Sequence, residues 1–295
     1  MKTILVTGGN GQLGQELKRL SDNHAASFIF TDTAELDITD RAAVTAFFDA
    51  HQIDVCINCA AYTAVDRAEE EQAAAHRVNV AGPENLALAC QHYGAMLLHI
   101  STDFVFDGKA CRPYPVTATA APLGVYGETK RQGEVKVLEA HPEGTAIVRT
   151  SWLYSAYGGN FVKTMLRLGK ERESLQVIAD QVGTPTWARD LAVALLAMAD
   201  RYFADDSPRQ LRGIYHFSNE GVASWYDFAK AVFDLAGLPV TVRPIPTEAY
   251  PTPATRPAYS VLDKSHFKQT FNVAIPYWRD SLAACLKEIA GQTVT

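Results

Sequence analysis

Three glycines at a regular spacing, Gly8, Gly11 and Gly14, constrain the fold of this chain more than any other feature. A β-rich run at residues 2–7 precedes them, and leucines at helical spacing follow them. A glycine loop between a strand and a helix lets the backbone approach a pyrophosphate, which then rests on the helix N-terminus. The spacing differs by one residue from G-x-G-x-x-G, and such turns can also be purely structural. The strand–loop–helix context favours a dinucleotide-binding loop.

Strands and helices alternate after this loop. Apolar runs predict strands at residues 28–30, 55–59, 95–100 and 146–149, and amphipathic patterns predict helices at 41–51, at 64–85 and from residue 125 onward. Such alternation is typical of an α/β fold with a Rossmann-type doubly wound parallel sheet. Ligands of these sheets bind at the carboxyl ends of the strands, so we expect the functional site at that edge.

Later segments break the alternation and predict a smaller C-terminal substrate-binding lobe. We expect the dinucleotide-binding domain to span residues 1–155, with about 175–218 returning to it. The lobe would comprise about 156–174 and 219–295. A chain of 295 residues is long enough for one large domain with such an addition.

Asp32 lies at the end of the second predicted strand, about 20 positions past the glycines. An acidic residue there is expected to accept hydrogen bonds from the adenosine ribose, which favours NADH because a 2′-phosphate would be repelled. Asp32 could instead cap a loop or a helix, and such sites can accept NADPH as well as NADH. The other residues expected beside the cofactor are Gly8, Gly11, Gln12, Leu13, Gly14, Asp37, Ile38, Ala60, Ala61, Tyr62, Tyr126 and Lys130.

Thr102, Tyr126 and Lys130 form the candidate catalytic set. Tyr126 and Lys130 are four residues apart on a predicted helix and therefore share one face. A nearby ammonium is expected to lower the phenol pKa from its usual value of about 10. Thr102 follows a strand end, where its hydroxyl could hold a carbonyl oxygen beside the phenol. Each residue also has a purely structural interpretation, but together they predict a proton-delivery site for reducing a ketone.

Composition excludes several classes of protein. A net charge of −6 and the lack of a dense Lys/Arg block argue against a nucleic-acid partner. No apolar run approaches the roughly 18 residues of a membrane-spanning helix, and the first residues are too short for a signal peptide. We therefore expect a cytoplasmic protein without a membrane partner. Cys56 and Cys59 should point to opposite faces of a strand, which favours two core residues over a metal or redox pair.

Several stretches resemble known enzymes. The glycine loop, Thr102 and Tyr126-x-x-x-Lys130 resemble the extended short-chain dehydrogenase/reductases. Within that class the chain is similar to the dTDP-4-dehydrorhamnose reductases over nearly its whole length. The stretches that carry this resemblance are Ala60–Asp66, Ser101–Gly108, Arg149–Trp152, Asn160–Phe161 and Pro253–Pro257.

The resemblance implies NAD(P)H-dependent reduction of dTDP-4-dehydro-6-deoxy-L-mannose to dTDP-L-rhamnose, a precursor of bacterial surface polysaccharides such as lipopolysaccharide O-antigen. It assigns catalysis to Thr102, Tyr126 and Lys130. It implies that the dTDP-keto-sugar is bound by Thr63, Val65, Thr102, Asp103, Trp152, Asn160 and Arg256. Taken alone, Trp152 is also a typical packing residue at a strand end.

The resemblance also raises the question of a metal. Some relatives bind Mg2+ between subunits through glutamates, and Glu16 and Glu288 resemble two of those positions, whereas Arg189 occupies the third. Arg189 could pair with both carboxylates in place of Mg2+, so Mg2+ stays open as a cofactor and no metal ligands are assigned. The sequence leaves the oligomeric state open, with a homodimer as one form.

Other functions remain open on this scaffold. One is another nucleotide-sugar 4-ketoreductase, a 4-epimerase or a 4,6-dehydratase, although a dehydratase would carry Asp and Glu after its catalytic threonine and Phe104 follows Asp103 here. A second is a non-catalytic NAD(P)-binding regulatory subunit, against which the intact Thr102, Tyr126 and Lys130 set argues.

Overall fold

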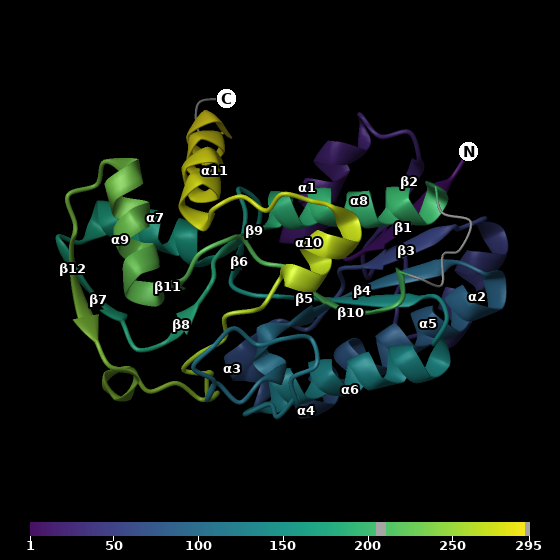
Figure 1. The fold of residues 1–295 in the computed structure, drawn as a ribbon, viewed down its shortest axis with the longest axis horizontal. Coiled ribbons are helices and arrows are strands. Elements are labelled where there is room, and N and C mark those ends of the chain that lie inside the picture. Colours follow the sequence, from purple (N-terminus) through teal and green to yellow (C-terminus); the bar gives the residue numbers. More distant parts are fainter. Residues whose placement is uncertain (205–210, 293–295) are drawn as a thin grey trace.

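The structure, a computed structural model, describes residues 1–204 and 211–292. Its centre is a six-stranded sheet in which all neighbouring strands run parallel (Figure 1). The strand order is β10 (Gly213–His216), β5 (Thr145–Thr150), β4 (Met96–Thr102), β3 (Val55–Asn58), β1 (Thr3–Thr7) and β2 (Ser27–Thr31). The predicted Rossmann-type parallel sheet is confirmed.

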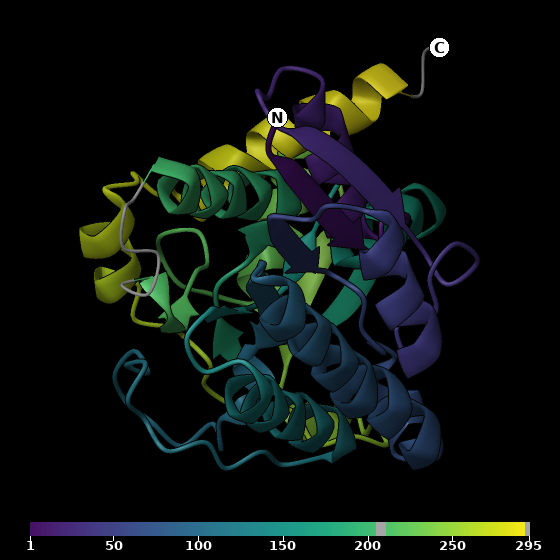
Figure 2. The ribbon, with the colours of Figure 1, turned by 90° about the vertical axis from the view of Figure 1, so that its right-hand side faces the viewer.

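Helices cover both faces of this sheet (Figure 2). On one face lie α1 (Gln12–Ser21) and α8 (Ala188–Ala204), and on the other lie α2 (Arg41–Ala50), α5 (Gly82–Tyr93) and α6 (Val125–Ala140). Side chains along each strand alternate between the two layers: Ile4 and Val6 pack under α1 and α8, whereas Leu5 faces the opposite layer. Cys56 and Cys59 likewise face opposite layers, as expected.

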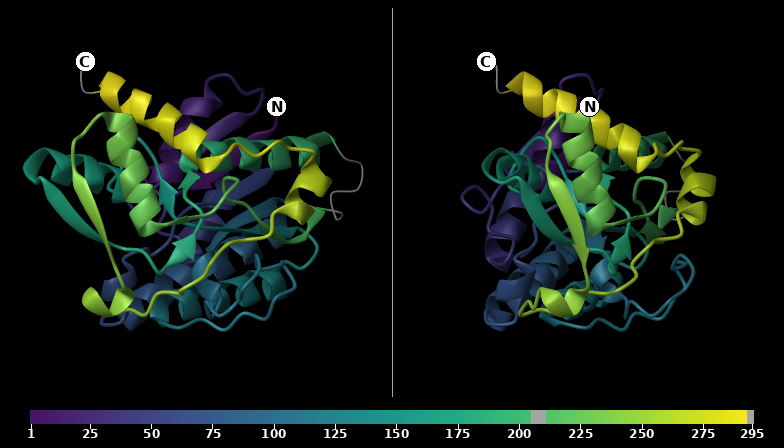
Figure 3. Two further views of the ribbon diagram at one scale, coloured as in Figure 1. Left: turned by 60° about the vertical axis from the view of Figure 1, so that its left-hand side comes forward. Right: turned by 90° about the vertical axis from the view of Figure 1, so that its left-hand side faces the viewer.

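Most of the remaining elements after β5 form a lobe beside the sheet, on the left in Figure 1 and toward the viewer in the right panel of Figure 3. The longer elements share one apolar core. They are α7 (Phe161–Glu171), β7 (Ser174–Ile178), α9 (Trp225–Ala236), β12 (Thr241–Ile245) and α11 (Trp278–Gln292). Short strands connect them: β6 (Leu153–Tyr154), β8 (Val182–Gly183), β9 (Thr186–Trp187) and β11 (Ala223–Ser224). The short helix α10 (Ser265–Phe271) packs instead against β10 and α8, through Phe267 and Phe271.

The segment 175–218, which we expected to return to the sheet, is divided between the main sheet and the lobe. Its helix α8 and strand β10 lie on the main sheet, whereas β7 pairs with β12 in a separate two-stranded sheet. β12 was not predicted, because prolines near it masked the strand pattern. The division into two domains stays a prediction.

The predicted long helix at residues 64–85 is wrong. The structure has α3 (Val65–Ala68), α4 (Gln72–His76), a π-helical turn (Arg77–Ala81) and then α5. Hydrogen bonds from residues outside these two helices stabilise the break between α3 and α4. Glu69 Oε1 accepts a hydrogen bond from the backbone N–H of Val125, and Glu71 Oε2 accepts one from the Tyr62 hydroxyl. These bonds stabilise a bend that helical periodicity alone does not reveal.

A buried ion pair fixes α6 on the sheet. Arg149 on β5 donates from Nε and Nη2 to the two carboxylate oxygens of Glu134 on α6, both at 2.7 Å. Ser101 on β4 donates to Glu134 Oε1 at 2.6 Å. Burial alone would raise the pKa of Glu134, but these donors outweigh it and lower the pKa.

We predict that Arg149→Met lowers the free energy of unfolding by about 3 to 5 kcal/mol, because it leaves the Glu134 carboxylate buried without its main cation. Urea unfolding at neutral pH measures the change. Arg131→Met is the matched control: Arg131 also contacts Glu134 Oε2, at 3.0 Å, but is one-third exposed, so its loss should cost at most about 1 kcal/mol. Equal effects of the two substitutions would contradict the assignment.

Candidate active site

A cleft of about 780 Å³ lies where the carboxyl ends of the strands face the lobe. The glycine loop, the ends of β2, β3, β4 and β5, and the lobe residues Trp225 and Arg256 all line it. Every residue predicted for the cofactor, the substrate or catalysis lines this cleft except Tyr62 and Asn160. The topology therefore brings together side chains that are up to about 250 positions apart in the chain.

The glycine loop has the geometry that a bound pyrophosphate requires. Gly8 adopts φ +67°, and a Cβ there would lie 2.7 Å from the backbone N of Ala60. A Cβ on Gly14 would lie 2.4 Å from the carbonyl oxygen of Gly8. No side chain caps the N-terminus of α1 after Gly11. Its first N–H groups, including that of Leu13, can therefore receive a phosphate.

Asp32 has the loop-capping role that the sequence left open. Its Oδ2 accepts a hydrogen bond from the N–H of Asn10 at 3.1 Å, and its Oδ1 accepts one from the N–H of Thr33 at 2.8 Å. The carboxylate thus braces the glycine loop while it lines the cleft. Asp37 and Ile38 line the same end, where Ile38 packs under Gly82. Binding of an adenosine at this end of the cleft stays a prediction.

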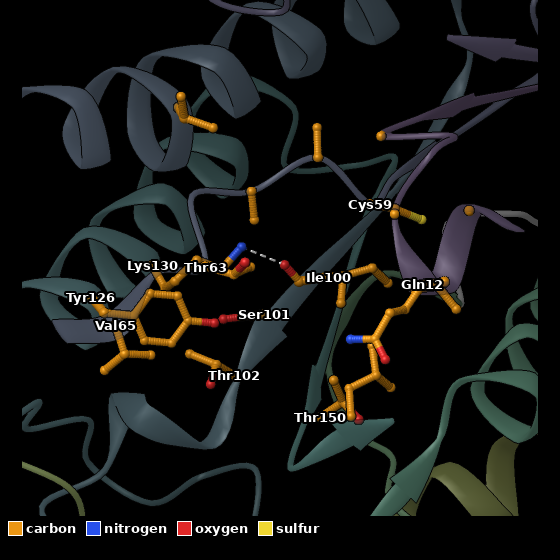
Figure 4. A pocket seen from close by; sticks show the side chains of 18 of the residues that line it. Gln12, Cys59, Thr63, Val65, Ile100, Ser101, Thr102, Tyr126, Lys130 and Thr150 are labelled. Atoms are coloured by element: carbon orange, nitrogen blue, oxygen red, sulfur yellow. Dashed lines mark hydrogen bonds between the residues drawn. The ribbon is translucent and has the colours of Figure 1, made fainter. Parts of the chain in front are cut away.

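Tyr126, Lys130 and Thr102 converge in the middle of the cleft (Figure 4). Tyr126 and Lys130 project from α6, and Thr102 ends β4. Lys130 is 2% exposed and its Nζ donates to the carbonyl oxygen of Ile100 at 2.7 Å, which is the dashed line in Figure 4. The ring of Phe104 packs edge-on against the phenol, with centroids 5.4 Å apart.

The expected low phenol pKa is wrong for this structure. Burial raises the pKa of Tyr126 to about 12, although the Thr102 hydroxyl lowers it in part. Burial also lowers the pKa of Lys130 to about 8. The ammonium is engaged with a backbone carbonyl, and desolvation of the phenol is the largest influence on the pKa of Tyr126. At neutral pH Tyr126 therefore holds its proton, which is the form that a proton donor needs.

Asp103 is a buried acid beside this group. It is 1% exposed, and the Thr102 hydroxyl donates to its Oδ1 at 3.1 Å. Burial raises the pKa of Asp103 to about 6, against smaller lowering contributions from the Ser260 and Thr102 hydroxyls. The carboxyl therefore changes protonation near neutral pH within the cleft.

Of the two predicted residues that do not line the cleft, Asn160 bonds a residue that does, and Tyr62 is bonded to residues outside the cleft. The Asn160 side-chain amide donates to Gln12 Oε1 at 3.0 Å, and its Oδ1 caps the start of α7. Tyr62 is held by Asn79, whose Oδ1 accepts from the Tyr62 N–H at 2.8 Å. Direct contacts of Asn160 and Tyr62 with a ligand therefore stay predictions.

The lobe end of the cleft carries an aromatic pair and an arginine. Trp152 stacks on Trp225 with ring centroids 3.6 Å apart and an angle of 7° between the planes. Arg256 forms a two-point ion pair with Asp66, with Nη1–Oδ1 at 3.0 Å and Nη2–Oδ2 at 2.7 Å. Sequence reasoning missed Trp225 and Asp66, because no local pattern links them to the strand ends. Thr63 and Val65 line the cleft close to Asp66 in the chain.

Arg189 pairs with both glutamates, as expected. Its Nε donates to Glu16 Oε2 at 2.9 Å, and its Nη2 donates to Glu288 Oε1 at 2.7 Å. The guanidinium supplies the positive charge that a divalent cation would bring, and it occupies the carboxylate oxygens. These residues therefore do not fit the Mg2+ site that the resemblance implied.

A Rossmann sheet in which Thr102 at a strand end meets Tyr126 and Lys130 of the following helix, beside a glycine loop, is the arrangement of the extended short-chain dehydrogenase/reductases. The fold and the site thus define an NAD(P)-dependent oxidoreductase.

Comparisons with known proteins narrow this class. Residues 1–290 match the family model described as the RmlD substrate binding domain. The chain is 45% identical over 289 residues to a dTDP-4-dehydrorhamnose reductase of Streptomyces griseus, covering 98% of this chain and 94% of that protein. It is 39% identical to a dTDP-4-keto-6-deoxy-D-glucose reductase of Streptomyces niveus, covering 94% of each.

Comparison with solved structures indicates the same family. A dTDP-4-dehydrorhamnose reductase of Bacillus anthracis in complex with NADP matches with a TM-score of 0.92 and 40% identity, covering 98% of this chain and all of that one. A UDP-glucose 4-epimerase of Thermus thermophilus, at 19% identity and a TM-score of 0.79, shares the fold alone. The chain belongs to the dTDP-4-dehydrorhamnose reductase family.

We predict that Asp103 makes a contribution to the free energy of unfolding that falls as pH rises through about 6. A folded-state pKa of about 6, raised from 3.8, contributes stability below the unfolded value that is lost as pH rises through about 6. Asp103→Asn removes this loss. Its free energy of unfolding relative to wild type should therefore rise by about 2 to 3 kcal/mol between about pH 4 and about pH 7 in urea unfolding.

Asp107→Asn is the matched control in the same segment. The Tyr114 hydroxyl holds the pKa of Asp107 below its usual value, so its contribution is lost as pH falls. The control should therefore become less stable relative to wild type as pH rises. The same slope for both variants would refute the role of burial at Asp103.

Proposed function

We propose that this chain reduces the 4-keto group of dTDP-4-dehydro-6-deoxy-L-mannose to give dTDP-L-rhamnose, with NADPH or NADH as the reductant. The observation that carries the proposal is the convergence of Thr102, Tyr126 and Lys130 on a cleft shared with the dinucleotide loop. The family relationship over nearly the whole chain supports the dTDP-sugar as substrate. The product would serve the biosynthesis of surface polysaccharides.

The residues of the cleft divide the chemistry between them. A bound NADPH or NADH supplies the hydride. Tyr126, protonated at neutral pH, gives its proton to the sugar oxygen at C4. The Thr102 hydroxyl orients that oxygen beside the phenol. Lys130, anchored on the Ile100 carbonyl, places a positive charge next to the cofactor ribose and the reacting centre.

Arg256 is the candidate group for the dTDP diphosphate, because a guanidinium binds phosphate oxygens at two points. It is one-quarter exposed in the cleft and is preorganised by Asp66, Thr252 Oγ1 and the carbonyl of Ala254. With these acceptors on one side, its other edge can turn to a diphosphate. Trp152 would contact the sugar, and Asp103 would bond its hydroxyls.

A second candidate is reduction of a different dTDP-4-keto-6-deoxy sugar. The Streptomyces niveus relative, named for the D-glucose stereoisomer, is nearly as similar to this chain as the rhamnose enzymes are. Side-by-side turnover of the two keto-sugars separates these candidates.

The setting of the reaction is part of the proposal. No helix among residues 1–204 and 211–292 is long and apolar enough to cross a membrane. A cytoplasmic location fits the supply of reduced cofactor and nucleotide sugars, and a homodimer stays a prediction for the assembly.

We predict that wild-type protein oxidises NADH or NADPH, followed at 340 nm, only when the dTDP-keto-sugar is present. Tyr126→Phe should lower kcat by roughly 10²- to 10⁴-fold, because it removes the proton donor without emptying the cleft. Wild-type protein that oxidises no cofactor in the presence of the dTDP-keto-sugar would contradict the reductase proposal.

Tyr93→Phe is the control for this substitution. Tyr93 lies at the surface end of α5 and bonds Asp49, so its loss should leave kcat within about twofold of wild type. If Tyr126→Phe also stays within twofold, the assigned donor is wrong.

We predict that Asp32→Asn shifts the ratio of kcat/KM toward NADPH by about tenfold, because it removes the charge that repels a 2′-phosphate. The amide keeps an oxygen that accepts the loop hydrogen bond from Asn10. Steady-state kinetics with both cofactors measure the ratio. Asp22→Asn, at an exposed position after α1, is the control and should leave the ratio unchanged.

A further inference from the structure

Trp152 has a conformation that its own local sequence does not favour. Its φ is +46°, in the left-handed region that bulky side chains rarely adopt. Such a backbone persists only where surrounding contacts hold it, and it occurs preferentially at functional sites. The backbone N–H of Thr186 donates to the Trp152 carbonyl at 3.1 Å, which is one of these contacts.

Two lobe residues hold the indole from different sides. Trp225 stacks on one face of it at 3.6 Å. On another side, Gly183 approaches so closely that a Cβ there would lie 2.7 Å from Trp152 Cε2 and 2.8 Å from Nε1. Any larger residue at position 183 would displace the ring.

Both contacts come from one rigid unit. Gly183 on β8 pairs directly with Ala223 on β11, and Trp225 follows β11 as the first residue of α9. Ser224 and Asp227 form a reciprocal capping box at this helix start. Phe161 packs behind Trp225 with centroids 4.8 Å apart. Trp225 and Gly183 therefore keep a fixed separation.

The indole lies close to the reacting centre. Thr150 at the end of β5 is in register with Thr102 on β4, and Trp152 follows two residues later. Trp152 and Trp225 both line the cleft. If the cofactor places its pyrophosphate on the glycine loop and its adenosine beside Asp32, an aromatic face at this point is available to the keto-sugar.

From this geometry we infer that Trp225 and Gly183 are positioning residues that hold Trp152 in the orientation that binds the sugar ring of the substrate. The inference rests on the proposed function for the identity of the sugar. The two residues set the affinity for the dTDP-sugar, and they do not act on hydride or proton transfer.

The test measures binding apart from turnover. Calorimetric titration of the full chain with dTDP-L-rhamnose gives Kd, and steady-state kinetics give kcat and the KM for the keto-sugar and for NADH. Trp225→Ala should raise Kd and the sugar KM about fivefold to tenfold, with kcat within about threefold and the NADH KM unchanged. Trp225→Phe, which keeps an aromatic face, should stay within about twofold of wild type.

Gly183→Ala tests the same inference from the other side. It should also raise Kd and the sugar KM, without truncating any side chain. Trp278→Phe is the matched control: Trp278 is buried in the lobe core, edge-on to Phe228 at 6.0 Å, and does not line the cleft. Its Kd should stay within about twofold of wild type.

A double-substitution cycle separates positioning from direct contact. In a Trp152→Ala background, Trp225→Ala should add less than about twofold to Kd, because the group that it positions is gone. An undiminished effect in that background, or unchanged Kd in both Trp225→Ala and Gly183→Ala, would overturn the inference. A wild-type chain that binds dTDP-L-rhamnose but does not turn over the keto-sugar would instead contradict the proposed function.

Discussion

The buried pair between Glu134 and Arg149 is the interaction on which the geometry of this site depends. Glu134 lies one helical turn after Lys130 on α6, so the two side chains share the face toward the sheet. Lys130 bonds the carbonyl of Ile100, and Glu134 bonds the hydroxyl of Ser101. The helix is thus joined to β4 at two successive residues immediately before Thr102. A slip of α6 by one turn would break both bonds and leave Glu134 and Arg149 unpaired inside the protein.

Burial is also the dominant electrostatic effect in the cleft. It raises the pKa of Tyr126 and Asp103 and lowers that of Lys130, so each group is pushed toward its neutral form. A neutral phenol is the protonated form, which suits a reductase that delivers a proton. The cost of burying these polar groups is offset by the ordered donors and acceptors of β4 and α6. The same low-dielectric surroundings strengthen any interaction with charge that develops on a bound ketone.

Particular residues show which features of the fold and the site could be predicted from the sequence and which could not. The parallel sheet, the glycine loop and the placement of Asp32, Thr102 and Tyr126 at one edge were predicted correctly, because each depends on residues within a few positions of one another. The helix at 64–85 was not, because hydrogen bonds to Glu69 and Glu71 from distant groups stabilise its break. The predicted low pKa of the phenol was also wrong. Spacing shows that Lys130 is near Tyr126, but it does not show how far the fold removes the phenol from water.

Spacing along the chain was therefore sufficient for the fold class, the glycine loop and the placement of Thr102, Tyr126 and Lys130 in one cleft, since turn geometry and helical periodicity are local properties. Only the folded chain shows that Trp225 lies against Trp152 and that Asp66 holds Arg256. These partners are 73 and 190 positions apart. Their meeting depends on how the lobe packs against the strand ends, and no periodicity in the sequence encodes that packing.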